Sequence, residues 1–135
     1  MRFEESLEEG YAKRVRVDTI RARNLAAAGR KAIETAKAIP LSDASSKTIL
    51  RELYEGLREC CEAIGHKHGY KFLSHEAITH FLAGIPEEQK VSRRFDRYRK
   101  LRNGINYYGE DIALETVEEA SEEIPSLLRR LERHF

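Results

Sequence analysis

Apolar residues recur at spacings of three and four along most of the chain, which is the periodicity of one face of an α-helix. The clearest stripe lies in the middle of the sequence and comprises Leu50, Leu53, Leu57, Cys61 and Ile64. No segment shows the alternation typical of a strand, and no internal repeat or low-complexity stretch interrupts the series. The sequence therefore predicts an all-α fold, an antiparallel up-and-down helical bundle of about five helices.

Capping residues and helix breakers divide the chain into these five predicted helices. Their approximate ranges are 19–39, 43–64, 75–82, 88–107 and 111–131. Asp18, Ser42 and Ser74 are the expected N-caps, because a short polar side chain can accept a hydrogen bond from a free N–H of the first turn. Gly65 and Gly69 are expected to end the second helix. Residues 1–17 are expected to form an N-terminal extension or a short helix.

The first and last predicted helices each carry an apolar stripe, and the last one also contains a proline. The stripes are Leu25, Ala28, Ala32, Ala36 and Ile39 in the first helix, and Val117, Ala120, Ile124, Leu127 and Leu131 in the last. Pro125 lies inside the second stripe, where a proline costs about 3 kcal/mol in a regular helix. We therefore expect a kink or a restart near Ile124.

Length and composition predict one domain spanning residues 1–135, large enough to bury a core without metals or disulfides. Charged residues make up 35% of the sequence, but the formal net charge is only +1, so the whole-chain charge favours neither nucleic acid nor an acidic partner. No apolar run is long enough for a signal peptide or a membrane span, so we expect a cytoplasmic protein. Cys60 and Cys61 are adjacent, a poor geometry for bridging, and are expected to be reduced.

Charge is nevertheless concentrated in the predicted helix 88–107. Seven basic residues and one acidic residue lie between Lys90 and Arg102, whereas the following helix begins with a run of acidic residues. Either these two segments are solvated or mutually compensating faces, or the basic segment is a surface that binds phosphate groups. Arg97 and Lys100 share one helical face with Arg93, while Arg102 points elsewhere.

Arg102 occupies an unusual position, because it falls on the apolar stripe formed by Phe95, Tyr98 and Ile105. A guanidinium keeps its charge, so its burial without a partner is costly. Arg102 therefore requires an anion or an interface. It either pairs with an acidic residue of the last helix and fixes helix packing, or binds a phosphate or carboxylate ligand.

Three further polar residues follow Arg102 at helical spacing and complete a candidate ligand-binding set. Asn106 lies one turn after Arg102 and is positioned to share its ligand, while Asn103 and Tyr107 form a second pair at the same spacing. Arg97 and Lys100 are expected to attract the ligand from the neighbouring face. The predicted binding residues are thus Arg102, Asn103, Asn106, Tyr107, Arg97 and Lys100.

The segment YRKLRNGINYYGED, residues 98–111, preceded by GHKHGYKFLSHEAITHFL, residues 65–82, resembles the HEPN family of small all-helical domains. The resemblance covers roughly residues 18–133. It implies a homodimer without cofactors, and many family members are metal-independent endoribonucleases, often paired with a nucleotidyltransferase antitoxin. In the family's pattern an arginine followed by a polar residue precedes a histidine, and Arg102 and Asn103 match the first half.

The histidine of that pattern is missing from this sequence. The three positions where the pattern would place it hold Tyr107, Tyr108 and Gly109. A tyrosine, with an ordinary pKa of about 10, is a poor acceptor for the proton of a ribose 2′-hydroxyl at neutral pH. If the chain is active, Arg102, Asn103 and Tyr107 are the residues implied.

We therefore expect a dimeric nucleotide- or RNA-binding module with a degenerate, inactive ribonuclease site. The alternatives are a protein-interaction partner of a nucleotidyltransferase in a toxin–antitoxin-like pair, or an active metal-independent endoribonuclease.

The remaining histidines do not indicate a metal site. His66, His68, His75 and His80 lie near the two cysteines. His75 and His80 are five positions apart, however, and a pair that binds a metal from one helix is typically four apart. No Walker-type loop or nucleophile elbow is present either. We expect no metal or cofactor.

Overall fold

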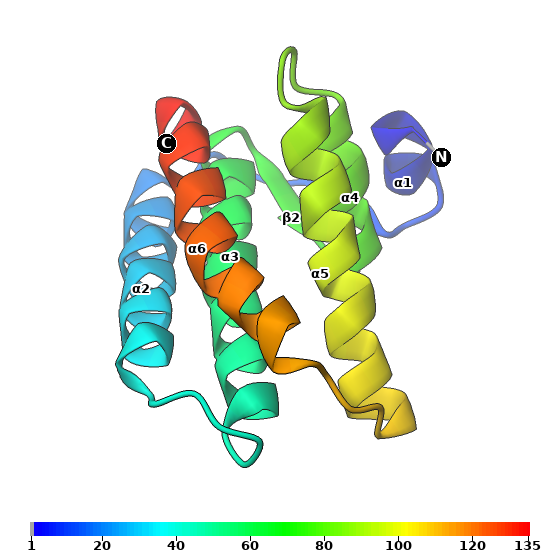
Figure 1. The fold of residues 1–135 in the computed structure, drawn as a ribbon. Helices are drawn as coiled ribbons and strands as arrows, with labels where there is room; N and C mark the ends of the chain where they lie inside the picture. The colour runs from blue at the N-terminus through cyan, green and yellow to red at the C-terminus, as the bar shows by residue number, and fades with distance from the viewer. Residues whose placement is uncertain (1) are drawn as a thin grey trace.

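The apolar stripe in the middle of the sequence forms the central helix of the protein. The computed structural model describes residues 2–135, and Figure 1 shows the arrangement of its elements. These are α1 (Phe3–Glu8), β1 (Ala12–Arg14), α2 (Thr19–Ala38), α3 (Ser46–Lys67), β2 (Tyr70–Phe72), α4 (His75–Ala83), α5 (Gln89–Tyr108), α6 (Leu114–Leu131) and a 3-10 turn, Glu132–His134. The predicted all-α helical bundle is confirmed, with α4 as the short third helix of the prediction and α1 as a short helix within residues 1–17, one of the two alternatives expected there.

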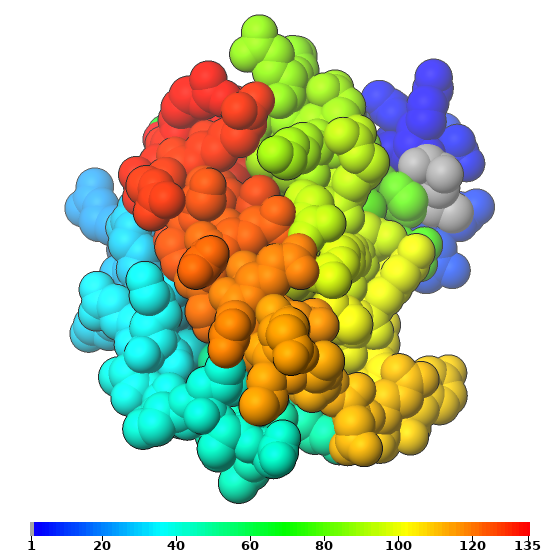
Figure 2. All heavy atoms as spheres, in the orientation of Figure 1, coloured from blue at the N-terminus to red at the C-terminus, as the bar shows by residue number. Residues whose placement is uncertain are grey.

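Helix α3 contacts α2, α4, α5 and α6 and carries most of the core. All five residues of its predicted stripe are fully buried. In the space-filling view of Figure 2, α6, in orange and red, covers the face between α2 and α5. None of the helices within residues 2–135 has the length and apolar character needed to cross a membrane.

Helices α2 and α3 approach closely because two glycines face each other where they pack. A Cβ added at Gly29 would lie 2.6 Å from the carbonyl oxygen of Gly56, and a Cβ added at Gly56 would lie 2.6 Å from that of Gly29. Such distances are too short for any side chain. Cys60, on the next turn of α3, is buried in the same contact, and its thiol donates to the carbonyl of Ala26 at 3.8 Å. Both cysteines are free.

A short antiparallel sheet, absent from the sequence-based prediction, joins the N-terminal segment to the bundle. Its strands pair Ala12 with Phe72 and Arg14 with Tyr70. Three residues are too few to show a strand periodicity, and the pairing depends on a contact between distant parts of the chain. The sheet brings Phe72 onto α3, where a Cβ added at Gly65 would lie 2.6 Å from the phenyl ring.

Two predicted N-caps are confirmed and one is wrong. The side chains of Asp18 and Ser74 accept hydrogen bonds from backbone N–H groups in the first turns of α2 and α4. Ser42, by contrast, lies in the turn before α3, whose N-cap is Ser45. Ser45 instead donates to the carbonyl of Pro40, at 2.6 Å, which closes this turn.

Three other details of the helices differ from the prediction. Gly65 lies inside α3 rather than at its end, and the helix ends before Gly69, whose positive φ of 85° suits a glycine. Ala28 is exposed, because α2 turns its Ala22, Ala26, Gly29 and Ile33 side toward the core. Helix α6 continues through Pro125 without restarting, so of the two predicted outcomes only a kink remains as a prediction. Burial of its stripe against the core, Val117 to Leu131, offsets the missing hydrogen bond of the proline.

Candidate functional site

An open pocket of about 360 Å³ lies between the N-terminal end of α4 and the C-terminal half of α5. Its lining comprises Ser74, His75 and Glu76 from the start of α4, and Arg99, Arg102, Asn103 and Tyr107 from α5. The Ser74 cap fixes where α4 begins and hence where His75 and Glu76 lie. Three of the predicted binding residues, Arg102, Asn103 and Tyr107, are thus brought together.

Arg102 is half-buried and has no acidic partner among the described residues. Its guanidinium carbon lies 5.9 Å from the centre of the Tyr54 ring, and Nη1 donates a long hydrogen bond of 3.4 Å to the side chain of Asn103. The other arginine of the pocket, Arg99, pairs with Asp96 at 2.8 Å. Arg102 is therefore the pocket cation whose donors remain available to a ligand.

The predicted alternative, a pair between Arg102 and an acid of the last helix, is wrong. Arg94 makes that contact instead, with Nη2 2.6 Å from a carboxylate oxygen of both Glu119 and Glu123. The hydroxyl of Tyr98 also donates to Glu123. Burial alone would raise the pKa of Glu123, but the hydrogen bonds from Arg94 and Tyr98 hold it below its ordinary value.

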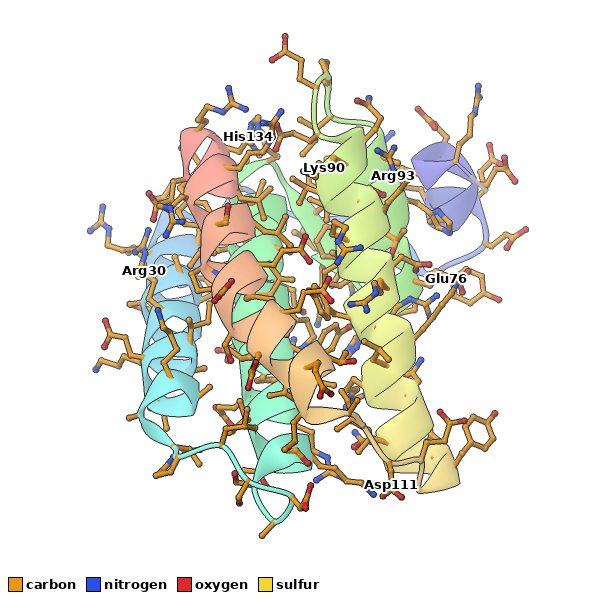
Figure 3. All side chains as sticks on the ribbon, viewed as in Figure 1. Arg30, Glu76, Lys90, Arg93, Asp111 and His134 are labelled. Carbon is orange, nitrogen blue, oxygen red and sulfur yellow. The ribbon has the colours of Figure 1, made fainter. Side chains whose placement is uncertain are left out.

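Most basic residues of α5 form ion pairs with acidic residues, as the first of the two interpretations predicted. Arg97 lies 3.6 Å from Glu119, and Lys100 lies 3.2 Å from Asp96. Lys90 and Arg93, at the start of α5 in Figure 3, have no ion pair in the part of the chain that the structure describes. The field of α5 is thus weaker than the sequence suggests.

Three of the predicted binding residues lie outside the pocket. Arg97 and Lys100 line a separate surface depression with Arg93 and Glu110. The side chain of Asn106 is exposed, and its Oδ1 accepts a hydrogen bond of 2.7 Å from Nε of Arg51 on α3. Helical spacing places Asn106 one turn from Arg102. The packing of α5 against α3, however, directs the Asn106 side chain toward Arg51 and away from the pocket.

His75 is the residue that sequence reasoning missed. It lines the pocket beside Arg102 although it belongs to another helix, and its Nδ1 lies 2.9 Å from the hydroxyl of Tyr54. Burial, together with the charges of Arg58 and Arg102, lowers its pKa from 6.5 to about 4. His75 is therefore neutral at pH 7. Nothing in the sequence pairs it with Arg102, because the contact depends on how α4 packs against α5.

The hydrogen bond to Tyr54 also decides which nitrogen of His75 carries the proton. Burial raises the pKa of Tyr54, so the hydroxyl keeps its proton, and this buried proton needs an acceptor. Within residues 2–135, Nδ1 of His75 is the only partner of that hydroxyl. Nδ1 therefore accepts, Nε2 carries the ring proton, and Nε2 has no hydrogen-bond partner in the described part of the chain.

The pocket as a whole is suited to hold an anion. Arg102 keeps further donors besides the Nη1 bond to Asn103, the Nε2–H of His75 is unused, and Asn103 supplies an amide beside them. Glu76 is the acid of the lining, and it lies at the rim, 3.9 Å from His80. No three histidine, cysteine or acidic side chains gather within residues 2–135 as a metal site would require.

Comparison with known proteins adds no relative. No protein-family model, curated protein or solved structure matches the chain.

Proposed function

We propose that the chain is a nucleotide- or RNA-binding module that holds a phosphate group in the pocket between α4 and α5. The supporting observation is the position of Arg102, an arginine without an acidic partner in the described chain, beside the neutral His75. A guanidinium binds a phosphate with two parallel hydrogen bonds, and the Nε2–H of His75 adds a third donor. Tyr107, which is 70% exposed at the pocket edge, offers a ring on which a base can stack.

Fluorescence anisotropy with a labelled single-stranded RNA tests this proposal. Arg102→Ala should weaken binding by about 2 kcal/mol, the loss of a charge-assisted contact. Arg93→Ala is the matched control, because Arg93 is an exposed arginine of the same helix without an ion pair in the described residues. It should weaken binding only slightly, and less as salt is added. Equal losses in the two variants, or no binding at low salt, would show that the proposal is wrong.

RNA cleavage is a second candidate function, favoured by the presence of a histidine beside Arg102. A general base needs an unprotonated nitrogen near the ribose 2′-hydroxyl, and a neutral histidine at pH 7 meets half of that requirement. The hydrogen bond from Tyr54, however, places the proton on Nε2. Reversing the tautomer would leave the buried Tyr54 proton without an acceptor, at a cost of about 1–3 kcal/mol. This observation favours binding over cleavage.

A cleavage assay in EDTA separates the two candidates. The unchanged protein should cut single-stranded RNA slowly or not at all. Tyr54→Phe removes the donor that fixes the tautomer and should increase any cleavage, whereas adding His75→Gln to that variant should abolish it. Efficient cutting by the unchanged protein that Arg102→Ala abolishes would establish an active ribonuclease instead.

The proposal includes a homodimer with a HEPN-like association. Tyr108, next to the pocket residue Tyr107 at the end of α5, is 79% exposed, and a large exposed aromatic favours a protein contact. Light scattering should return a dimer at micromolar concentration, and Tyr108→Ser should weaken it. A monomer would remove the dimer from the proposal. It would favour a different protein on this surface, such as a nucleotidyltransferase.

A further inference from the structure

A second pocket lies on another part of the molecule, between α2, the end of α3 and the last residue of the chain. It has a volume of about 340 Å³ and is lined by Thr19, Ala22, Arg23, Ala26, Arg30, Ala63, Lys67 and Phe135. None of these residues belongs to the pocket at Arg102. The second pocket therefore requires an explanation of its own.

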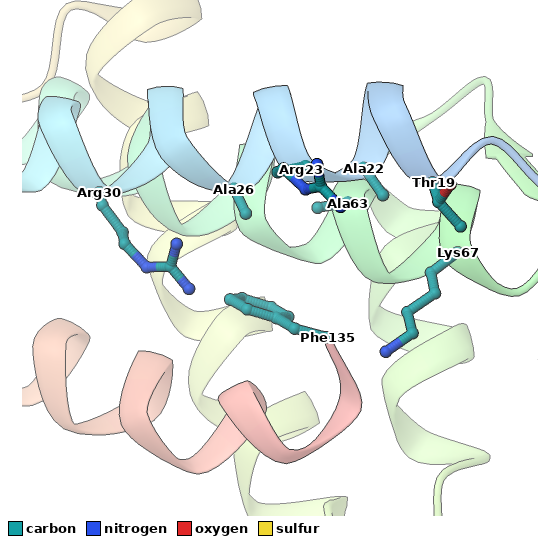
Figure 4. A pocket seen from close by; sticks show the side chains of 8 residues that line it. All are labelled: Thr19, Ala22, Arg23, Ala26, Arg30, Ala63, Lys67 and Phe135. Carbon is teal, nitrogen blue, oxygen red and sulfur yellow. The ribbon is translucent and has the colours of Figure 1, made fainter.

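The walls of this pocket are largely apolar. Ala22, Ala26 and Ala63 form one side as a small buried cluster, and Phe135 packs against this cluster. The phenyl ring of Phe135 lies opposite them, as Figure 4 shows. Arg30 holds this ring in place, because its guanidinium carbon lies 5.1 Å from the ring centre. The result is a slot with apolar walls.

Positive charge is unevenly distributed around the slot. Arg30 lies at one end in Figure 4 and is partly neutralised by Glu132, 3.9 Å away. Lys67 extends into the other end, and Arg23 projects from α2 between them. Neither Lys67 nor Arg23 has an ion pair among residues 2–135. The end of the slot near Lys67 and Thr19 is thus the more positive one.

We propose that this pocket binds a small molecule with a planar apolar ring system and one anionic group. The ring lies beside Phe135, over the part of the alanine cluster that Phe135 leaves uncovered, where it gains stacking and burial of apolar area. The anion lies at the end near Lys67, where the ammonium and the Thr19 hydroxyl are the donors and Arg23 adds its field. The volume is at the lower end of the range for small-molecule sites and suits one or two fused rings.

This site differs from the pocket at Arg102 in the ligand it selects. The slot combines an apolar surface with basic residues at its ends, whereas the pocket at Arg102 offers several donors around an open space. A planar aromatic carboxylate should therefore bind at Phe135, and a phosphate of RNA should not compete with it. The inference stands independently of the proposed function.

Calorimetric titration with 2-naphthoate, and with its neutral analogue 2-naphthamide, tests the proposal. We expect 2-naphthoate to bind about tenfold more tightly than 2-naphthamide, because the amide lacks the charge that Lys67 attracts. Lys67→Glu should remove this preference, and Phe135→Ala should weaken both probes. Lys37→Glu is the matched control, an exposed lysine of α2 outside the slot, and should leave both affinities unchanged.

A steric variant locates the site directly. Ala26→Leu should fill the slot and abolish binding of 2-naphthoate, and a retained circular dichroism spectrum shows that the variant is folded. If Ala26→Leu does not fold, Lys67→Glu and Phe135→Ala, at more exposed positions, carry the same test. Absence of saturable binding at millimolar 2-naphthoate, equal affinity for the two probes, or loss of binding in Arg102→Ala rather than Lys67→Glu would overturn the proposal.

Discussion

The hydroxyl of Tyr54 on α3 lies 2.9 Å from Nδ1 of His75 on α4 and joins the core to the pocket beside Arg102. This hydrogen bond satisfies a buried phenol and at the same time orients a pocket side chain. Because both partners belong to this chain, the effects of the hydrogen bond on pKa and stability can be measured without knowing the ligand.

His75 should titrate far below an ordinary histidine. Nuclear magnetic resonance of its ring protons should give a pKa near 4, since burial and the charges of Arg58 and Arg102 disfavour the charged form. The unfolded chain, with a histidine pKa near 6.5, binds more protons between pH 6.5 and 4. The free energy of unfolding should therefore fall as the pH falls through that range. His75→Gln should show a smaller fall, and a ring pKa near 6.5 would contradict the prediction.

Arg94→Ala should lower the free energy of unfolding by about 2–3 kcal/mol, because it leaves the partly buried Glu123 without its closest cation. Urea denaturation measures the effect. Arg93→Ala removes the neighbouring exposed arginine, which has no ion pair in the described residues, and should change stability by less than about 0.5 kcal/mol. Similar losses for both variants would show that the α5–α6 ion pairs contribute little.

Gly56→Ala should destabilise the protein by about 2 kcal/mol or more, although alanine has the higher helix propensity. The added Cβ would lie 2.6 Å from the carbonyl oxygen of Gly29 and force α2 and α3 apart. Gly84→Ala provides the control, since its nearest contact would be 3.5 Å and its φ is −82°. Thermal unfolding compares the two, and a stable Gly56→Ala would show that the helices can separate at little cost.

Glu88→Gln should lower the free energy of unfolding by about 3 kcal/mol. Glu88 is fully buried, and its Oε1 accepts hydrogen bonds of 3.0 Å from both Arg130 and Arg133, which hold the start of α5 against the C-terminal segment. Glu87→Gln, at the exposed neighbouring position, should have little effect. Guanidinium denaturation distinguishes the two variants. Equal stability of the two would mean that this buried carboxylate contributes nothing.

The sequence alone predicted the elements that depend on interactions between residues close together in the chain. The stripe of α3 follows from a spacing of three and four within one helix, and the caps Asp18 and Ser74 act on N–H groups three residues away. Ser42 was the wrong cap because Ser42 and Ser45 both precede the helix, and the turn that Ser45 closes on Pro40 selects between them. The pairing of β1 with β2 depends on a contact between distant segments, so no periodicity in the sequence predicted it.

The candidate site divides in the same way. The sequence placed Arg102, Asn103 and Tyr107 together, because all three lie within two turns of one helix. Asn106 has the same spacing yet turns to Arg51. The partner of the acidic helix proved to be Arg94 rather than Arg102. Helical spacing fixes which side chains share a face, but not which face meets a neighbour.

What the sequence determined was thus the set of helices and the presence of an arginine on an apolar stripe. Only the tertiary structure decided that His75 lies beside that arginine, that Tyr54 fixes its proton, and that Phe135 covers an alanine wall on α2 and α3. The physical reason is the range of the interactions. Backbone hydrogen bonding and side-chain periodicity act over a few residues, whereas contacts between helices depend on how each helix is rotated and crossed against the others.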